Sequence, residues 1–111
     1  MIKLYGIKNC SSVKKGIEFL EAKKLDFEFL DIKKLSEKEL DFFLSKKPFE
    51  VLINTAGMSA RKLNINKEFI AKSSKDELKN IVLTNPSLIK RPVICSDDTV
   101  LVGKEYEQYF S

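Results

Sequence analysis

Cys10 is the residue of this sequence best placed to do chemistry, in the stretch YGIKNCSSVKKG, where a β-strand pattern gives way to a helical one. A thiol at a helix start faces unpaired backbone N–H groups and the positive end of the helix dipole, and both favour the thiolate. Nearby cations lower a thiol pKa further. We therefore predict that Cys10 is a nucleophile whose charge is stabilised by Lys8, Ser11 and Ser12. The alternative is a small apolar residue in a turn.

The absence of histidine restricts the chemistry that remains. A Ser-His-Asp triad and a Cys-His pair are both excluded. Two cysteines without histidine cannot complete an all-protein Cys/His zinc site in one chain. The candidates are a thiolate, carboxylates and lysines, and we expect no metal and no tightly bound cofactor.

The composition indicates one globular domain, because the 111 residues are 43% hydrophobic. The formal net charge of +4 comes from lysines scattered among acids, which is typical of a solvated surface and disfavours direct nucleic-acid binding. No apolar run approaches the roughly 18 residues of a membrane span. The N-terminus lacks the apolar region of a signal peptide, so the expected location is the cytoplasm. Cysteines there seldom form a permanent disulfide.

The first third of the chain predicts a βαβ unit. Residues 2–5 and 25–32 read as strands, and the segment between them reads as a helix capped by Ser11 or Ser12. Strands joined in this way are parallel. Gly16, inside the helix, leaves room for another segment to pack closely. The predicted apolar face of the helix comprises Val13, Ile17, Leu20 and Lys24.

The rest of the chain predicts helices followed by a hairpin. Ser36 with Glu39, and Ser74 with Glu77, have the spacing of a capping box at the start of a helix. Pro48 suits the first turn of a short helix that ends near residues 54–57, and short helical turns follow. PVICS and TVLVG flank two aspartates as a hairpin, and KEYEQYF closes the chain as a helix.

The predicted fold class is therefore α/β, with a thioredoxin-like arrangement of βαβ and ββα halves around a mixed sheet. The halves cover about residues 1–32 and 86–111, and a helical insertion covers about residues 35–85. All of them form one domain, residues 1–111.

Three motifs, LYGIKNC, NTAGMSARKLN and LIKRPVIC, resemble in order and spacing the arsenate-reductase-like family. That family contains ArsC-type arsenate reductases, the regulator Spx and YffB-type proteins, and the sequence shares most motifs with the YffB type. The resemblance covers nearly the whole chain. It implies a thioredoxin-like fold with a helical insertion, Cys10 as the reactive thiol, Pro92 as a cis-proline and Arg91 as an anion-binding partner.

The sequence departs from the ArsC-type pattern of one cysteine and three arginines. Arg91 matches one arginine, Asn54 stands where a second belongs, and Gly103 or Lys104 stands near the third. Arg61 offers a substitute, and both Asn54 and Arg61 are candidates for stabilising the thiolate or a bound anion. Each charge-assisted hydrogen bond contributes about 1.5–3 kcal/mol, so losing two of them weakens oxyanion binding and disfavours arsenate reduction.

The second cysteine is not placed to resolve a disulfide on the first. Spx uses a C-x-x-C switch, and Val13 stands here at its fourth position. Cys95 follows Pro92 by three residues, roughly 10 Å along a strand, whereas bridged cysteines need Cα atoms within about 7 Å. If Pro92 abuts Cys10, Cys95 is a buried core residue.

The predicted function is a thiol-dependent reductase. The Cys10 thiolate attacks an oxidised substrate, a disulfide or an oxyanion, and an external thiol such as glutathione resolves the intermediate. Arg91, Lys8 and Arg61 would hold the carboxylates of glutathione. The alternatives are a Spx-like regulator that binds RNA polymerase, an arsenate reductase proper, and a family member without catalytic activity.

Overall fold

The computed structural model describes residues 1–111, which form two compact units. The first unit comprises Met1–Ile32 and Arg91–Ser111, and the second comprises Lys33–Lys90. None of the helices combines the length and the apolar character that crossing a bilayer requires.

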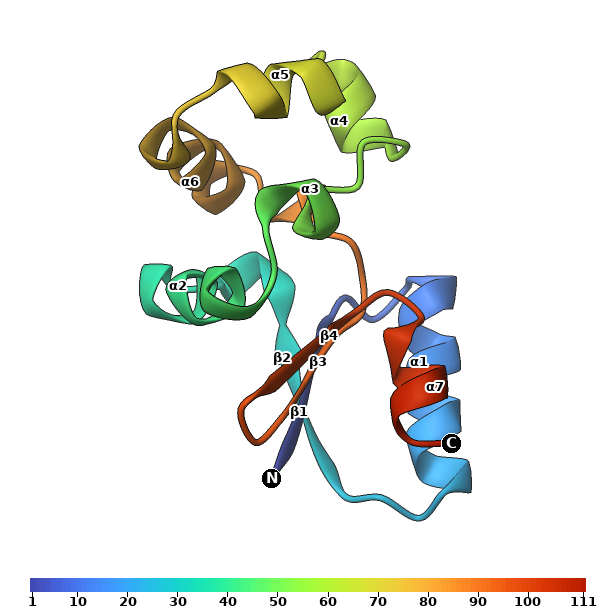
Figure 1. Ribbon diagram of the computed structural model, residues 1–111. Helices are drawn as coiled ribbons and strands as arrows, with labels where there is room; N and C mark the ends of the chain where they lie inside the picture. The colour runs from blue at the N-terminus through green and yellow to red at the C-terminus, as the bar shows by residue number, and fades with distance from the viewer. The chain divides into compact units, whose positions relative to one another are not determined.

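The first unit is built on a four-stranded mixed sheet with the order β2-β1-β3-β4 (Figure 1). β1 pairs in parallel with β2 and antiparallel with β3, and β3 and β4 form a hairpin. The turn of the hairpin places Asp97 at a φ of 52°, a left-handed conformation that aspartate tolerates. The sheet confirms the predicted α/β fold class with βαβ and ββα halves. Its strands are β1 (Ile2–Gly6), β2 (Phe27–Asp31), β3 (Val93–Ser96) and β4 (Thr99–Val102).

Two helices, α1 (Ser11–Ala22) and α7 (Glu105–Tyr109), cover one face of this sheet (Figure 1). The rings of Phe19 and Tyr106 meet edge to face between these helices, with centroids 5.1 Å apart. Strand alternation turns every second side chain towards the helices. The resulting core cluster consists of Leu4, Val13, Leu20, Ile94, Leu101 and Tyr106.

Helix α1 differs from the prediction at both ends. Cys10 is the N-cap residue, and Ser11 and Ser12 are exposed residues of the first turn. The prediction that Ser11 or Ser12 caps the helix was therefore wrong. Lys24 was also wrongly assigned to the apolar face, because the helix ends at Ala22 and Lys24 is exposed with a φ of 58°.

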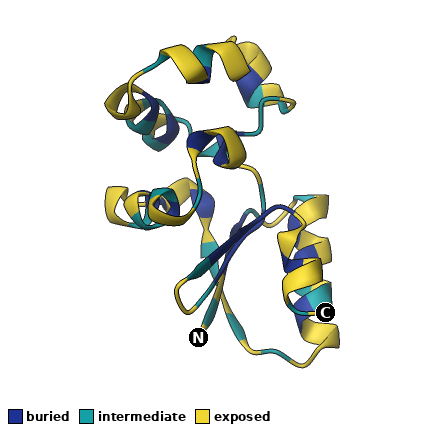
Figure 2. Ribbon diagram, viewed as in Figure 1, coloured by how far each residue is buried: buried dark blue, intermediate teal, exposed yellow.

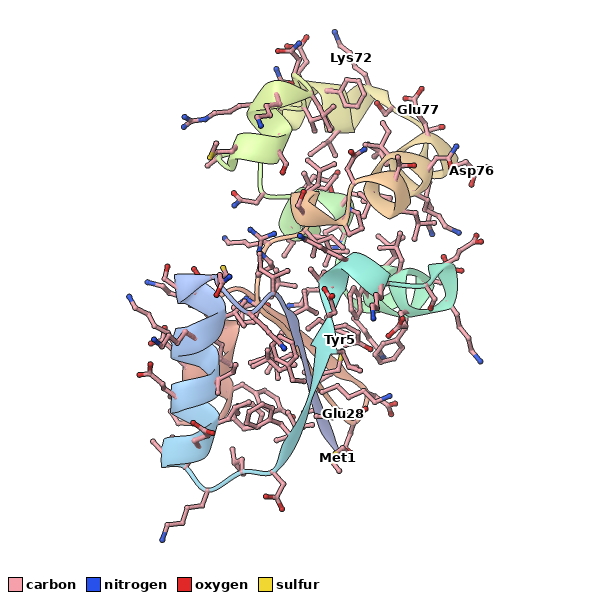
Figure 3. The ribbon with its side chains drawn as sticks, turned by 180° about the vertical axis from the view of Figure 1, so that it is seen from behind. Met1, Tyr5, Glu28, Lys72, Asp76 and Glu77 are labelled. Atoms are coloured by element: carbon pink, nitrogen blue, oxygen red, sulfur yellow. The ribbon has the colours of Figure 1, made fainter.

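The second unit is a cluster of helices. A short 3-10 turn, Ile32–Lys34, spans the boundary with the first unit, and another, Pro86–Leu88, lies near the end of the second unit. One side of each longer helix is buried and the other is exposed (Figure 2). Lys72, Asp76 and Glu77 are exposed (Figure 3), and Lys72 pairs with Glu68 one turn earlier at 2.7 Å. The helices are α2 (Glu37–Lys46), α3 (Phe49–Leu52), α4 (Met58–Lys62), α5 (Lys67–Lys72) and α6 (Lys75–Thr84).

Local capping signals account for most helix starts in this unit. The Ser36 hydroxyl accepts from the Glu39 N–H at 3.1 Å, and the Glu39 carboxylate accepts from the Ser36 N–H at 3.0 Å, which confirms the capping box. Ser74 accepts from the Glu77 N–H at 3.1 Å, so only half of the second predicted box forms. Pro48 is the N-cap of α3 rather than a first-turn residue, and α3 ends at Leu52, earlier than predicted.

Replacing Ser36 by alanine is expected to destabilise the protein by about 1 kcal/mol, because a backbone N–H loses its capping acceptor. Urea unfolding followed by circular dichroism measures the change. Ser45→Ala, near the end of the same helix, is the matched control and should stay within about 0.5 kcal/mol of the unsubstituted chain. Equal midpoints for the two variants would rule out a stabilising role of the box.

Candidate functional site

Cys10 stands at the junction between the turn that follows β1 and the first turn of α1. Its backbone is extended, with φ −109° and ψ 123°, and its carbonyl accepts the first helical hydrogen bond from the Lys14 N–H at 3.0 Å. The side chain is half-buried and packs against the core cluster. The sulfur is thus held at the positive end of a twelve-residue helix.

The surroundings of Cys10 favour its ionised form. Burial raises the pKa of the thiol, but hydrogen bonds from the Val13 N–H, the Arg91 side chain and the Ser12 N–H lower it, as does the positive charge of Arg91. The net result is a lowered pKa. The sulfur makes no helix-capping hydrogen bond of ordinary geometry, so several donors together, rather than one strong bond, stabilise the thiolate.

Arg91 reaches the thiol from the segment that leads into β3. The Arg91–Pro92 peptide bond is cis, and the Pro92 carbonyl accepts from the Gly103 N–H at 2.9 Å. A Cβ at Gly16 would lie 3.1 Å from Cγ of Pro92. Gly16 therefore allows the helix of Cys10 and the segment of Arg91 to pack closely, as its position in the sequence indicated.

Three other predicted residues of the first unit contribute less than expected. Lys8 is exposed in the turn before α1 and is not among the groups that shift the pKa of the Cys10 thiol. Ser11 contributes nothing to that shift, and Ser12 contributes through its backbone N–H rather than its hydroxyl. The Val13 N–H was missed, because every residue carries an amide and the sequence does not say which way it points.

The remaining predicted anion-binding residues, Asn54 and Arg61, belong to the second unit. The Asn54 side-chain oxygen accepts from the Ala56 N–H at 3.2 Å, and the Asn54 N–H donates to the Leu88 carbonyl at 2.8 Å. Arg61 is exposed on α4.

No arginine stands where the sequence suggested the third one, because that position falls at Gly103 or Lys104, between β4 and α7. Gly103 is buried and has a φ of 65°, a conformation in which an arginine would be strained. Lys104 follows as an exposed residue at the start of α7.

Cys95 is a buried residue of β3, with 6% of its surface exposed, as predicted. It lies opposite Lys3 of β1 and Val100 of β4. Its neighbour Ile94 faces the core cluster against which Cys10 packs, so strand alternation turns Cys95 to the other face of the sheet. Neither cysteine is part of a disulfide, and Cys10 has no partner thiol on its own face of the sheet.

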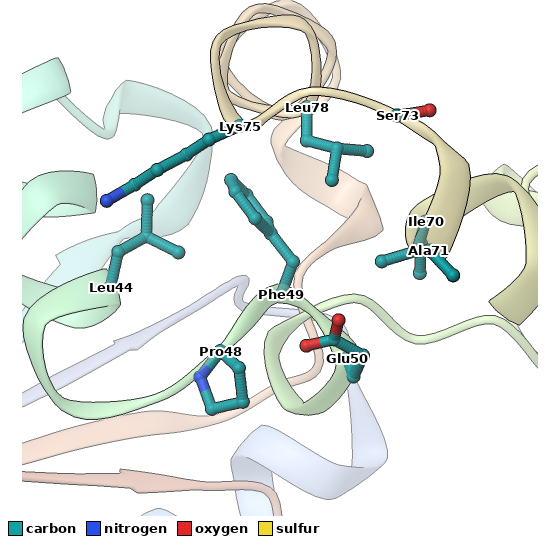
Figure 4. A pocket seen from close by; sticks show the side chains of 9 residues that line it. All are labelled: Leu44, Pro48, Phe49, Glu50, Ile70, Ala71, Ser73, Lys75 and Leu78. Atoms are coloured by element: carbon teal, nitrogen blue, oxygen red, sulfur yellow. The ribbon is translucent and has the colours of Figure 1, made fainter.

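A separate hollow of about 330 Å³ lies within the second unit, between α2, α3, α5 and α6 (Figure 4). Its lining is mainly apolar, with Glu50 and Lys75 as its charged members. No residue of the predicted site lines it. The lining residues are Leu44, Pro48, Phe49, Glu50, Ile70, Ala71, Ser73, Lys75 and Leu78.

A thiol at the start of the helix after β1, an arginine beside it and a cis-proline before β3 together define a thioredoxin-like protein with a helical insertion. The ArsC family model matches residues 5–111, and the chain belongs to the ArsC family. The family resemblance that the motifs predicted is therefore confirmed.

Known relatives span the full chain. An uncharacterized protein of Haemophilus influenzae is 34% identical over 117 residues, which cover all of both chains. An arsenate reductase (ArsC) related protein of Brucella melitensis has 35% identity and a TM-score of 0.76, over 99% of this chain and 94% of that one. A protein named YffB has 28% identity and a TM-score of 0.85, over 99% and 96%. Membership of this family supports a thiol-dependent, reductase-like role.

Proposed function

We propose that this protein is a thiol-dependent reductase in which the Cys10 thiolate attacks a disulfide and glutathione resolves the intermediate. The observation that carries the proposal is the lowered pKa of the Cys10 thiol, which follows from its position beside Arg91 and the first backbone N–H groups of α1. Cys95 faces away, so the second thiol must come from outside the chain.

The reaction proceeds by two thiol–disulfide exchanges. The Cys10 thiolate attacks the glutathione sulfur of a mixed disulfide, forms a Cys10–glutathione disulfide and releases the substrate as a thiolate, which takes a proton from water. A glutathione thiolate then attacks the glutathione sulfur bonded to Cys10. This step releases oxidised glutathione and restores the Cys10 thiolate. Over the two steps, one external glutathione thiol is oxidised: its sulfur joins the glutathione sulfur of the substrate as oxidised glutathione, and the substrate sulfur is released in reduced form as a thiol.

Cationic side chains near Cys10 would bind the carboxylates of glutathione. Arg91 hydrogen-bonds the Cys10 sulfur, and its fork of donors can also bind a carboxylate of the incoming thiol. Lys8, exposed in the turn before α1, is a second candidate for the carboxylates. The need for reduced glutathione suits a reducing compartment such as the cytoplasm.

An oxyanion substrate is less well supported than a disulfide. Only one of the three arginines of ArsC-type enzymes has a counterpart at the thiol of this chain, namely Arg91. The other two positions cannot supply the charge, since Gly103 has no side chain and Asn54 is neutral. Val13, where Spx has its second cysteine, is fully buried, which argues against a dithiol switch.

Mass spectrometry after incubation with oxidised glutathione tests the proposal. We expect one glutathione adduct, on Cys10, which reduced glutathione removes. Cys95→Ser is the control and should give the same adduct. A protein that stays unmodified by oxidised glutathione would contradict the mechanism. So would a Cys10 that reacts with iodoacetamide only in the pH range where a thiol of ordinary pKa ionises. That outcome would favour the regulator, which a pull-down of RNA polymerase with the Cys10→Ser variant examines directly.

A further inference from the structure

We propose that Gly6 is a positioning residue for Cys10. Because Gly6 has no side chain, Val13 packs directly on the end of β1, and this contact holds the Val13 N–H towards the Cys10 sulfur. The inference deepens the proposed function, since it concerns how the reactive thiol is prepared, but it can be tested without any substrate.

The contact between Gly6 and Val13 is too close for any other residue at position 6. A Cβ built on Gly6 would lie 2.6 Å from Cγ2 and 2.7 Å from Cγ1 of Val13, and 3.2 Å from its Cβ. Separations below 3.0 Å essentially never occur for a real Cβ. Gly6 is buried at the end of β1, and Val13 is completely buried in the core cluster, so the valine cannot turn aside without disturbing its neighbours.

Val13 links this contact to the thiol. Burial raises the pKa of Cys10, and the Val13 N–H is the strongest of the groups that lower it. Cys10 is the N-cap residue, and Val13 is the third residue of the helix. The N–H at this third position ordinarily donates a hydrogen bond to the side chain of the N-cap residue. The side chain and the N–H belong to one residue in a rigid first turn. A side chain at position 6 that pushes Val13 outwards therefore carries its N–H away from the sulfur.

The test is the pH profile of Cys10 alkylation by iodoacetamide, measured on the full chain with Cys95 replaced by serine. Gly6→Ala, which overfills the contact, is expected to move the profile to higher pH and to slow alkylation at pH 7 roughly three- to tenfold. Val13→Ala, which leaves the contact empty, is expected to move the profile in the same direction. The double variant puts one methyl back at position 6 and is expected to restore a profile close to that of the unsubstituted protein.

Two comparisons separate this role from a merely structural one. Val100→Ala removes the same two methyl groups from a buried site on β4 and should lower the melting temperature without moving the profile. Arg91, the charged group at the sulfur, is unchanged in every variant. If Gly6→Ala does not fold, Val13→Ala and the double variant still decide the question.

The inference would be overturned if the pH profile of alkylation shifted in none of the variants. It would also be overturned if the profile of the double variant shifted as far as that of Val13→Ala. Those results concern the pH profile alone. Adduct formation with oxidised glutathione in the unsubstituted protein would be unaffected, so the positioning role can fail while the proposed reductase function stands.

Discussion

Cys10→Ser is expected to reduce the rate of glutathione-dependent disulfide reduction to that of a reaction without protein. A serine hydroxyl stays protonated at neutral pH and cannot form the mixed disulfide on which both exchange steps depend. The measurement is the release of thiol from a glutathionylated peptide, coupled to the reduction of oxidised glutathione. Serine is close in size to cysteine, so the helix start should keep its geometry.

Cys95→Ser provides the matched comparison for this loss of activity. It changes the other thiol, on the opposite face of the sheet, and should retain the activity of the unsubstituted chain. Because Cys95 is buried, urea unfolding of the variant shows whether the added polar group affects stability rather than chemistry. Loss of activity in Cys95→Ser with normal stability would mean that the second cysteine resolves the intermediate, and the monothiol mechanism would be wrong.

Arg91→Met is expected to slow alkylation of Cys10 at pH 7 by about tenfold, because a hydrogen bond from a charged donor to the thiolate is lost. The sign follows from the lowered pKa of the thiol. A lowered pKa gives a larger thiolate fraction at neutral pH, so removing Arg91 raises the pKa and reduces that fraction. Well above both pKa values the thiol is ionised in each protein, and the two rates should converge.

Two further variants assign the effect of Arg91 to its charge and its geometry. Arg91→Lys keeps the positive charge but loses the planar fork of donors, so its profile should lie between those of Arg91→Met and the unsubstituted chain. Lys15→Met removes an exposed cation from α1 and should leave the profile in place. A uniform decrease in rate at all pH values for Arg91→Met would point to altered access to the sulfur instead of an altered pKa.

Much of the fold follows from short-range patterns in the sequence. The Ser36 and Glu39 pair specified a helix start, because both hydrogen bonds of the box close within one turn. The aspartate pair between two β-rich runs specified the hairpin for a similar local reason. Local patterns failed where neighbouring turns compete. The serines after Cys10 resemble capping residues, yet the chain places Cys10 at the cap because burial of Val13, Gly16 and Leu20 fixes the rotation of α1.

The sequence by itself determined the fold class, the absence of a histidine mechanism and the choice of Cys10 as the thiol to consider. Only the tertiary structure decided which groups act on that thiol. Arg91 arrives through the antiparallel pairing of β1 with β3, in which Tyr5 lies opposite Val93. The Val13 N–H acts on the thiol from a residue whose side chain packs against Gly6 at the end of β1. Local propensity extends over a few residues, whereas thiolate stabilisation depends on distances between groups remote in sequence, and these are set by packing of the sheet and helices.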